Sequence, residues 1–471
     1  MLGGKLLRKF ITVGIFMSLI FSLTGALCSN NQAAKKKNIT LTVWNLFDND
    51  TVYSDIISNY ERENPNVKIN YIKKDLNEYE LKTSEALAAG SGPDIWMIKS
   101  DWMPRHYDKL VAMPNGTLAA KTGKSDIDIY KDTFAPIAAN DNIIDNKIYG
   151  IPFSIDTMVL YMNKDLFNKK IQELFNSKQS DNAKMLQNSP STWDDVINYE
   201  KLLTIKDGSN IKQSGLAIGT ATNTDVSQDI LAMFMLQNHA QMVSADKKTA
   251  TFNLFTNKST GEPVYSGTNS LIFYTSFANP AKDNYSWNNS MGNSVQAFME
   301  GRVAMMLNYS YVKQTILQQA PTLNYDVAPL PQIKGTTVPI DYASYWVETV
   351  TKNSQNPQEA WNFIKYVATK GNSMYISATK RPSPDTVSKD SVPKSIDTRA
   401  SSGSDPFQFQ KMSATSWYKG KRADKVDTIF KDMIDNVVSK GQSAQTSIDA
   451  AAAQVTELLK QDTPPSLGVT N

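Results

Sequence analysis

Residues 39–98 alternate strand-like and helix-like segments, and this alternation constrains the fold more than any other feature of the chain. In order, a strand, a helix, a strand, a helix and a strand are expected at residues 39–43, 53–60, 67–71, 81–89 and 94–98. The first and third segments alternate apolar and polar residues, whereas the second has apolar residues at helical spacing. Strands separated by helices favour a parallel sheet with crossover helices. The sequence therefore predicts an α/β fold.

The same two patterns continue through a chain of 471 residues, a length that favours two or more domains. Further strands are expected at 148–152, 155–161, 215–219, 303–307 and 325–331, and further helices at 193–203, 230–236, 295–300 and 359–368. Apolar stripes at helical spacing over 426–438 and 448–459 predict two more helices near the C-terminus.

Composition excludes several chemistries. The chain has two histidines, His106 and His239, and one cysteine, Cys28, so a disulfide within the chain and a cysteine-based zinc site are excluded. We expect no catalytic residues, no metal and no cofactor. Beyond residue 28 the basic and acidic residues are equal in number, which gives no electrostatic footprint for nucleic acid.

The N-terminus has the layout of a secretory signal. Basic residues precede an apolar run over 10–23, and Cys28 follows it at the place where a bacterial lipoprotein has its acylated cysteine. Residues 1–28 are therefore predicted to be a signal or lipoprotein-signal segment, and 29–37 a polar tether. Leu27 stands where lipoproteins usually have a small residue, so ordinary cleavage or a retained membrane anchor remain alternatives. All three place the body of the chain outside the cytoplasm.

Several segments, taken in order, resemble the extracellular solute-binding proteins that serve carbohydrate ABC importers, the maltose-binding-protein type. The segments that carry the resemblance are ITLTVWNLFDND, YERENPNVKINYI, AAGSGPDIWMI, YGIPFSIDTMVLYMNKDLF, STWDDV, AFMEGRVAMMLNYSYV, YDVAPLPQIKG and NPQEAWNFIKYVAT. The resemblance spans roughly residues 39–460.

The resemblance implies a periplasmic-binding-protein-like fold, with two α/β lobes, a ligand cleft and hinge crossings. The first lobe is expected at 39–150 and 308–350, the second at 155–305 and 355–460, and a tail at 461–471. Crossings are expected near 152–154, 308–309 and 350–355. Hinges of this kind absorb backbone rotation while each lobe stays rigid.

Candidate ligand-binding residues follow from their places along the chain. In open α/β sheets, ligands bind beyond the carboxyl ends of the strands, and pockets favour domain interfaces. Aromatic rings can cover the apolar face of a sugar, and carboxylates and amides can pair with its hydroxyls. The candidates are Trp44, Asn45, Asp48, Asp101 and Trp102 at strand ends, Ser154, Asp156 and Tyr309 at crossings, and Trp287, Tyr345, Trp346 and Trp417 in polar, loop-like settings.

The resemblance implies a receptor that closes on a sugar or oligosaccharide and delivers it to ABC transporter permease subunits, acting as a monomer held at the membrane by an N-terminal lipid or anchor. Alternatives are another polar solute, such as a polyol or glycerol phosphate, or a sensory or adhesive receptor with the same fold. Arg105 and Arg381 could bind an anionic group, so an anionic ligand remains an alternative. A glycosidase would need two opposed carboxylates at a fixed separation, and no strand-end pair of glutamates stands out.

Overall fold

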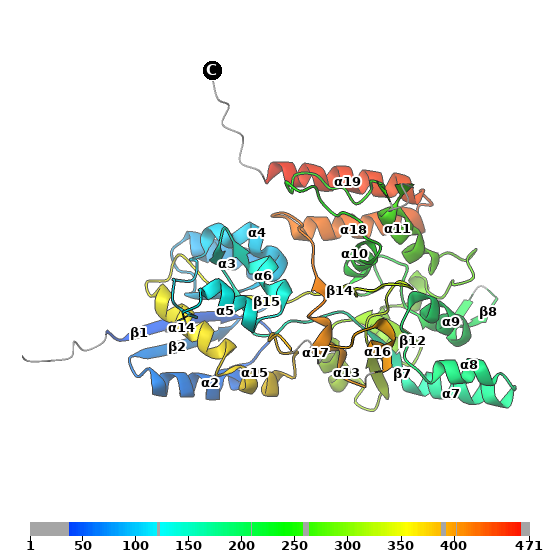
Figure 1. Cartoon of the computed structure of the whole chain (residues 1–471), viewed down its shortest axis with the longest axis horizontal. Coiled ribbons are helices and arrows are strands. Elements are labelled where there is room, and N and C mark those ends of the chain that lie inside the picture. The colour runs from blue at the N-terminus through cyan, green and yellow to red at the C-terminus, as the bar shows by residue number, and fades with distance from the viewer. Residues whose placement is uncertain are drawn as a thin grey trace, which may run out of the picture.

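Two five-stranded sheets form the centres of two lobes, which lie side by side in Figure 1. The computed structural model describes residues 37–119, 123–208, 210–257, 263–387, 392–401 and 403–462. The predicted signal segment with Cys28, all of the tether before residue 37 and the tail beyond residue 462 lie outside the described residues. The two-lobed α/β architecture confirms the predicted fold class.

The sheet of the first lobe contains the strands that the alternating N-terminal segments predict. Its strands are β1 (Ile39–Asn45), β2 (Val67–Lys73), β3 (Ile95–Lys99), β6 (Ile151–Pro152) and β15 (Trp346–Val350). Their order is β2-β1-β3-β15-β6, with β1 parallel to β2 and β3, and β15 antiparallel to β3. Because β15 runs in reverse, its first residue, Trp346, pairs with Lys99 at the end of β3. The end of β3 and the start of β15 therefore meet at one edge of the sheet.

Helices cover this sheet and contribute much of the first core. They are α2 (Asp50–Glu63), α3 (Tyr79–Ala88), α4 (Met103–His106), α5 (Asp126–Thr133), α6 (Pro136–Asn142), α14 (Pro357–Ala368) and α15 (Asn372–Thr379), with 3-10 turns at Ser100–Trp102 and Tyr107–Lys109. The predicted stripe of α14 is confirmed, since Trp361, Ile364 and Val367 are all fully buried. A hairpin of β4 (Ile143–Ile144) and β5 (Lys147–Ile148) also belongs to this lobe.

The second lobe has a mixed sheet. Its strands are β7 (Val159–Asn163), β8 (Ile205–Asp207), β9 (Asn210–Leu216), β12 (Val303–Asn308) and β13 (Tyr325–Ala328). Their order is β13-β7-β12-β9-β8, and β12 is parallel to β9 but antiparallel to β7. β12 is buried along its whole length, which explains its unbroken apolar sequence from Val303 to Leu307.

Helices surround the second sheet. They are α7 (Lys164–Asn176), α8 (Ser180–Leu186), α9 (Trp193–Leu203), α10 (Ser227–Gln237), α11 (Ser266–Ser276), α12 (Ser294–Met299), α13 (Val312–Gln319), α18 (Ala423–Val438) and α19 (Ala444–Gln461), with a 3-10 turn at Asn289–Met291 and a short pair of strands, β10 (Thr256–Asn257) and β11 (Pro263–Val264). The predicted C-terminal stripes are confirmed by α18 and α19, which run along one side of this lobe in Figure 1.

A two-stranded parallel ribbon lies between the lobes. It consists of β14 (Asp341–Tyr342) and β16 (Ala414–Thr415), with α16 (Ile396–Ser401) and α17 (Pro406–Gln410) in the connection that precedes β16. Asp341 is fully buried, and its carboxylate accepts hydrogen bonds from Arg399 and Ser413, each at 2.5 Å. The contact with Arg399 ties the ribbon to α16.

The chain passes between the lobes next to one of the expected crossings, but not at the other two. Ile155 belongs to the first core and Met158 to the second, so the first crossing lies just after 152–154. The second crossing is at Tyr342–Ala343, and not at 308–309. The third crossing lies after α15, and not at 350–355. The helix α15 still packs on the first core, whereas Trp417, which follows the ribbon strand β16, belongs to the second core.

Two expected lobe assignments change as a result. The segment after residue 308 was expected in the first lobe, but β13 pairs with β7 in the second sheet. The segment from 355 was expected in the second lobe, but α14 and α15 pack on the first core. Both lobe assignments depend on which of the two sheets an element packs on or pairs with. Local periodicity along the chain does not determine this.

A capping box formed by Thr192 and Asp195 fixes the start of α9 in the second lobe. Thr192 Oγ1 accepts a hydrogen bond from the Asp195 backbone at 3.2 Å, and Asp195 Oδ2 accepts one from the Thr192 backbone at 2.9 Å. Thr192→Ala removes this capping box and should lower the free energy of unfolding, measured by urea denaturation, by about 1 kcal/mol. Thr192→Ser keeps the hydroxyl and is the control. Equal losses for both variants would contradict the assignment.

Candidate functional site

Three aromatic side chains form a half-exposed surface on the first lobe, which we call the aromatic platform: Phe47, Trp102 and Trp346. Trp346 lies in the middle, with its ring centroid 5.2 Å from that of Phe47 and 5.2 Å from that of Trp102, both edge to face. Phe47 is 42% exposed, and the two tryptophans are half-buried. The platform exists because β1 and β3 end, and the antiparallel β15 begins, at the same edge of the sheet.

Two tyrosines follow β12 in the second lobe and stack on each other. The ring centroids of Tyr309 and Tyr311 are 6.2 Å apart, with 27° between the ring planes. The Tyr309 hydroxyl donates to Asp229 Oδ2 and the Tyr311 hydroxyl to Asp225 Oδ2, each at 2.9 Å. Tyr309 is buried, whereas Tyr311 is 49% exposed. The exposed ring is therefore that of Tyr311. Tyr309, which was predicted as a ligand-binding residue, is buried and packs against the ring of Tyr311.

Asp156 lies at the first crossing and holds the turn that carries these tyrosines. Its carboxylate accepts from the Ser310 backbone at 2.9 Å and from the Ser310 hydroxyl at 2.6 Å. Burial raises the pKa of Asp156 to about 6, although the hydrogen bonds from Ser310 act in the opposite direction. The predicted Asp156 thus links the crossing to the site, and the predicted Ser154 lies half-buried two residues before it.

A small polar pocket lies where both lobes meet the ribbon. It is lined by Lys99, Ser100, Asp101, Asp229, Tyr342, Ala343, Ser344, Ser416, Trp417 and Lys419. Two atoms at this pocket are buried without a hydrogen-bond partner among the described residues, Asp101 Oδ1 and Trp417 Nε1. One is an acceptor and the other a donor, so a polar solute that reached the pocket could pair with both.

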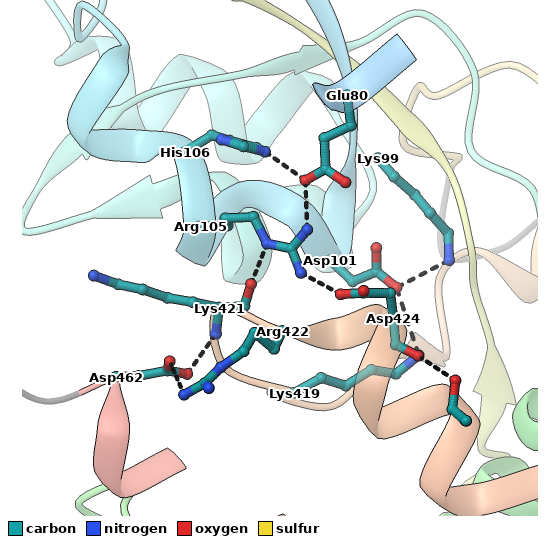
Figure 2. A network of polar contacts seen from close by, with 11 residues as sticks. Glu80, Lys99, Asp101, Arg105, His106, Lys419, Lys421, Arg422, Asp424 and Asp462 are labelled. Carbon is teal, nitrogen blue, oxygen red and sulfur yellow. Dashed lines mark hydrogen bonds and ion pairs between the residues drawn. The ribbon is translucent and has the colours of Figure 1, made fainter. Parts of the chain in front are cut away.

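Charges of opposite sign from the two lobes meet at this pocket, as Figure 2 shows. Asp101 Oδ2 lies 2.9 Å from Lys99 Nζ, within the first lobe, and 3.5 Å from Lys419 Nζ of the second. Lys419 is buried and also lies 2.6 Å from Asp427 and 3.8 Å from Asp229. Burial alone would raise the pKa of Asp101, but Lys99 and Lys419 outweigh it and lower that pKa. Asp101 is therefore ionised at neutral pH.

A second polar network lies beneath the platform. Asp48 Oδ2 accepts from Arg381 at 2.7 Å and from the Tyr375 hydroxyl at 3.0 Å. Asn45 Nδ2 donates to Glu348 Oε1 at 2.8 Å, and both residues are buried. Burial, together with the Asp48 carboxylate, raises the pKa of Glu348 to about 8. The predicted Asn45 and Asp48 therefore fix the end of β1, and Arg381 is engaged within the first lobe.

Three predicted aromatic residues do not reach the site in this conformation. Trp287 is fully buried in the second lobe, where its indole donates to Asn223. Tyr345 is buried in the first lobe, and its hydroxyl donates to Asp141 at 2.8 Å. Trp44 is half-buried, and the Lys74 ammonium lies 3.7 Å from its ring centroid. For Trp287 and Tyr345, a polar sequence context therefore did not distinguish a solvent-facing ring from a buried ring whose polar atom has a partner inside a lobe.

Trp417 is intermediate between these two groups. It is 8% exposed and packs against Phe430 at 5.2 Å between centroids, yet it also lines the polar pocket. The sequence places Tyr311 in the same run as the predicted Tyr309, whereas sequence reasoning missed Phe47, Lys99 and Lys419. Phe47 follows β1 by two residues, which could have indicated it, but nothing local distinguishes Lys419.

Neither a metal centre nor a membrane span is found in the parts of the chain that the structure describes. There, no three or more His, Cys, Asp or Glu side chains are arranged to hold a metal ion. No helix in the same described ranges has both the length and the apolar character to cross a membrane.

Two lobes joined by several crossings, with polar side chains of both lobes lining one pocket where they meet, have the architecture of a two-lobed binding protein. Residues 45–374 match the family model of the bacterial extracellular solute-binding proteins, which is more than half of the chain. The chain belongs to this family, whose members are solute-binding proteins and not enzymes, as the sequence analysis predicted.

Relatives of this chain support the same assignment. The maltodextrin-binding protein of Bacillus subtilis (strain 168) is 23% identical over 467 residues, which covers 97% of this chain and 99% of that protein. Among solved structures, the sugar-binding protein MalE of Xanthomonas citri is similar with a TM-score of 0.68 and 19% identity, covering 90% of this chain and 98% of that one. The cyclic α-maltosyl-1,6-maltose binding protein of Arthrobacter globiformis has the same TM-score at 16% identity, covering 90% and 99%.

Proposed function

We propose that this chain captures a sugar or oligosaccharide between its two lobes and presents it to the permease subunits of an ABC transporter. The observation that carries this proposal is the aromatic platform of the first lobe together with the exposed Tyr311 of the second. A sugar ring has an apolar face and a rim of hydroxyls. Aromatic side chains can cover the apolar face, and nearby carboxylates can accept hydrogen bonds from the hydroxyls. The relatives named above are similarly sugar-binding proteins.

Capture requires the lobes to move relative to one another. The crossings after Ile155 and at Tyr342–Ala343 are short connections outside the two five-stranded sheets, as hinge segments are. The third crossing, after α15, is longer and runs through α16, α17 and the ribbon strand β16. A solute that contacts both lobes binds the closed arrangement more tightly than the open one, and this difference in affinity is all that closure needs.

The place of action that fits this role is the outer face of the cell membrane. Membership of an extracellular family supports it, as does the signal layout of the sequence. Acylation of Cys28 would tether the protein there, and the protein would act as a monomer. Cys28 lies outside the described residues, so mass spectrometry of the cell-derived protein is the test of the lipid.

A thermal-melt screen tests the proposed solute class. A sugar present at 100 times its dissociation constant should stabilise the protein by about 2.7 kcal/mol, a rise of at least about a degree in Tm for a chain of this size. We expect such a rise with one class of mono- or oligosaccharide. Polyols and glycerol phosphates are the comparison set, and chromatography of the sugar after incubation checks that it is not turned over.

A rise with a polyol or glycerol phosphate and with no sugar would assign the protein to a different polar solute. Both solute classes are compatible with the polar pocket, whereas the aromatic platform favours sugars, because a sugar ring has an apolar face. Turnover of a sugar would contradict the assignment to a binding protein.

A further inference from the structure

A short segment of the second lobe is attached to the first lobe by charged contacts. This segment, residues 416–422, leads from the ribbon strand β16 into α18 and contributes Trp417 and Lys419 to the polar pocket. We propose that it is an interlobe clasp, engaged by Arg105 of α4, and that the engaged clasp stabilises the lobe arrangement that binds solute. The binding half of this inference rests on the proposed function.

The first step is that Arg105 bridges the two lobes. Its guanidinium donates to the backbone carbonyl of Lys421 and forms an ion pair with Asp424 at the start of α18. A third contact, to Glu80 Oε1 at 2.8 Å, stays within the first lobe and orients the side chain. His106 Nε2 lies 2.6 Å from the same Glu80 oxygen (Figure 2). Arg105 is thus held by its own lobe and reaches into the other.

The second step is that the clasp is fixed to the second lobe and cannot simply follow Arg105. Asp462, just after α19, accepts from the Lys421 backbone at 2.7 Å and pairs with Arg422 at 3.1 Å. Arg422 also donates to the Leu458 carbonyl at 2.9 Å. The turn itself needs glycine, since Gly420 has φ +71° and an added Cβ would lie 2.5 Å from Asp462 Oδ2.

The third step is that separation of the lobes breaks the clasp contacts. Arg105 lies on α4 and Asp424 on α18, and Figure 1 shows both helices on the same side of the ribbon strand β14. Asp101, four residues before Arg105, meets Lys419 of the clasp at 3.5 Å and is ionised. Moving the lobes apart therefore removes two charge-assisted contacts of Arg105 and one of Lys419, while the contacts inside each lobe remain. The engaged clasp favours the closer arrangement.

The proposal predicts that Arg105→Ala weakens solute binding without touching the platform. Because the binding-competent arrangement would be populated less, the apparent dissociation constant should rise by roughly three- to tenfold, a range set by the partial exposure of these contacts. Asp424→Asn should act in the same direction, and Arg105→Lys should restore part of the loss.

Arg302→Ala is the matched control. Arg302 also contacts one carboxylate and one carbonyl, Glu300 at 2.5 Å and Met291 at 2.9 Å, but both lie within the second lobe. It should change neither the affinity nor the lobe separation. Thermal melting of each variant checks that it folds.

A distance measurement tests the clasp independently of the solute. Spin labels at Lys82→Cys of the first lobe and Lys440→Cys of the second, in the full-length chain with Cys28→Ser, report the separation of the lobes by pulsed electron paramagnetic resonance. Arg105→Ala should shift the solute-free distribution to longer distances, and Arg302→Ala should not.

Each outcome is decisive. An unchanged distance distribution, or tighter binding by Arg105→Ala, would overturn the proposal. If the unaltered protein bound no sugar while Arg105→Ala still lengthened the distances, the proposed solute class would fail and the clasp would stand.

Discussion

Replacing Trp346 by alanine should weaken sugar binding by about ten- to hundredfold, the loss expected when the central ring of an aromatic contact surface is removed. Trp346 is in edge-to-face contact with both Phe47 and Trp102, at 5.2 Å between centroids in each case. Its loss therefore removes contact area and also leaves the two flanking rings without their common neighbour. Isothermal titration calorimetry with the sugar found in the thermal screen measures the change.

Two further variants separate this effect from a general loss of structure. Trp346→Phe keeps a ring at the centre of the platform and should lose less than tenfold in affinity. Tyr265→Ala removes an aromatic ring that is 44% exposed on the second lobe, where its neighbour is Phe255, and should bind like the unaltered protein. Undiminished affinity in Trp346→Ala would contradict the assignment of the platform to solute binding.

The local parts of the fold could be predicted because their causes are local. Thr192 and Asp195 mark the start of α9 through a capping box, and the helix begins at Trp193 as predicted. The stripes of α18 and α19 likewise follow from helical spacing alone. By contrast, β13 was expected in the first lobe, and its partner β7 lies far away in sequence. The helix α14 was expected in the second lobe because a crossing was predicted at 350–355, but the chain stays in the first lobe there and α14 packs on β15, which directly precedes it.

The candidate site was predictable to the extent that strand ends determine it. Trp102 and Asp101 follow β3 directly, and the structure places both at the edge where the site forms. Trp287 shows that residue type alone does not identify a ligand-binding side chain. Its indole is buried because Asn223, which is distant in sequence, accepts a hydrogen bond from it. Lys419 shows the limit of sequence position, since it joins Asp101 only when segments more than 300 residues apart fold together.

A pH-dependent stability should arise from one buried acid beneath the platform. The pKa of Glu348 is raised to about 8 by burial first and by the neighbouring Asp48 carboxylate second. In the unfolded chain the same group has its ordinary pKa of 4.5. The folded protein therefore keeps a proton on Glu348 between about pH 4.5 and pH 8, whereas the unfolded chain releases it.

The sign of the effect follows from this difference. Protonated Glu348 contributes fully to stability below pH 4.5, and this contribution falls as the pH rises until it is lost above about pH 8. At about 1.4 kcal/mol per pH unit, the interval from 4.5 to about 8 sets an upper limit of roughly 5 kcal/mol for the loss. Asp141 and Asp156, with pKa values raised to about 6, act in the same direction.

Glu348→Gln isolates the contribution of this one residue. Glutamine keeps the oxygen that accepts from Asn45 at 2.8 Å and has no proton to lose over this range. Urea unfolding between pH 5 and pH 9 should show the variant and the unaltered protein close together at pH 5, with the variant more stable by several kcal/mol at pH 9.

Glu300→Gln is the control, since Glu300 is paired with Arg302 at the surface and its pKa is lowered, not raised. Its stability should run parallel to that of the unaltered protein from pH 5 to pH 9. If Glu348→Gln ran parallel as well, Glu348 would be ionised in the folded state, and the buried charge would require a cationic partner closer than Arg381, which is engaged by Asp48 at 2.7 Å.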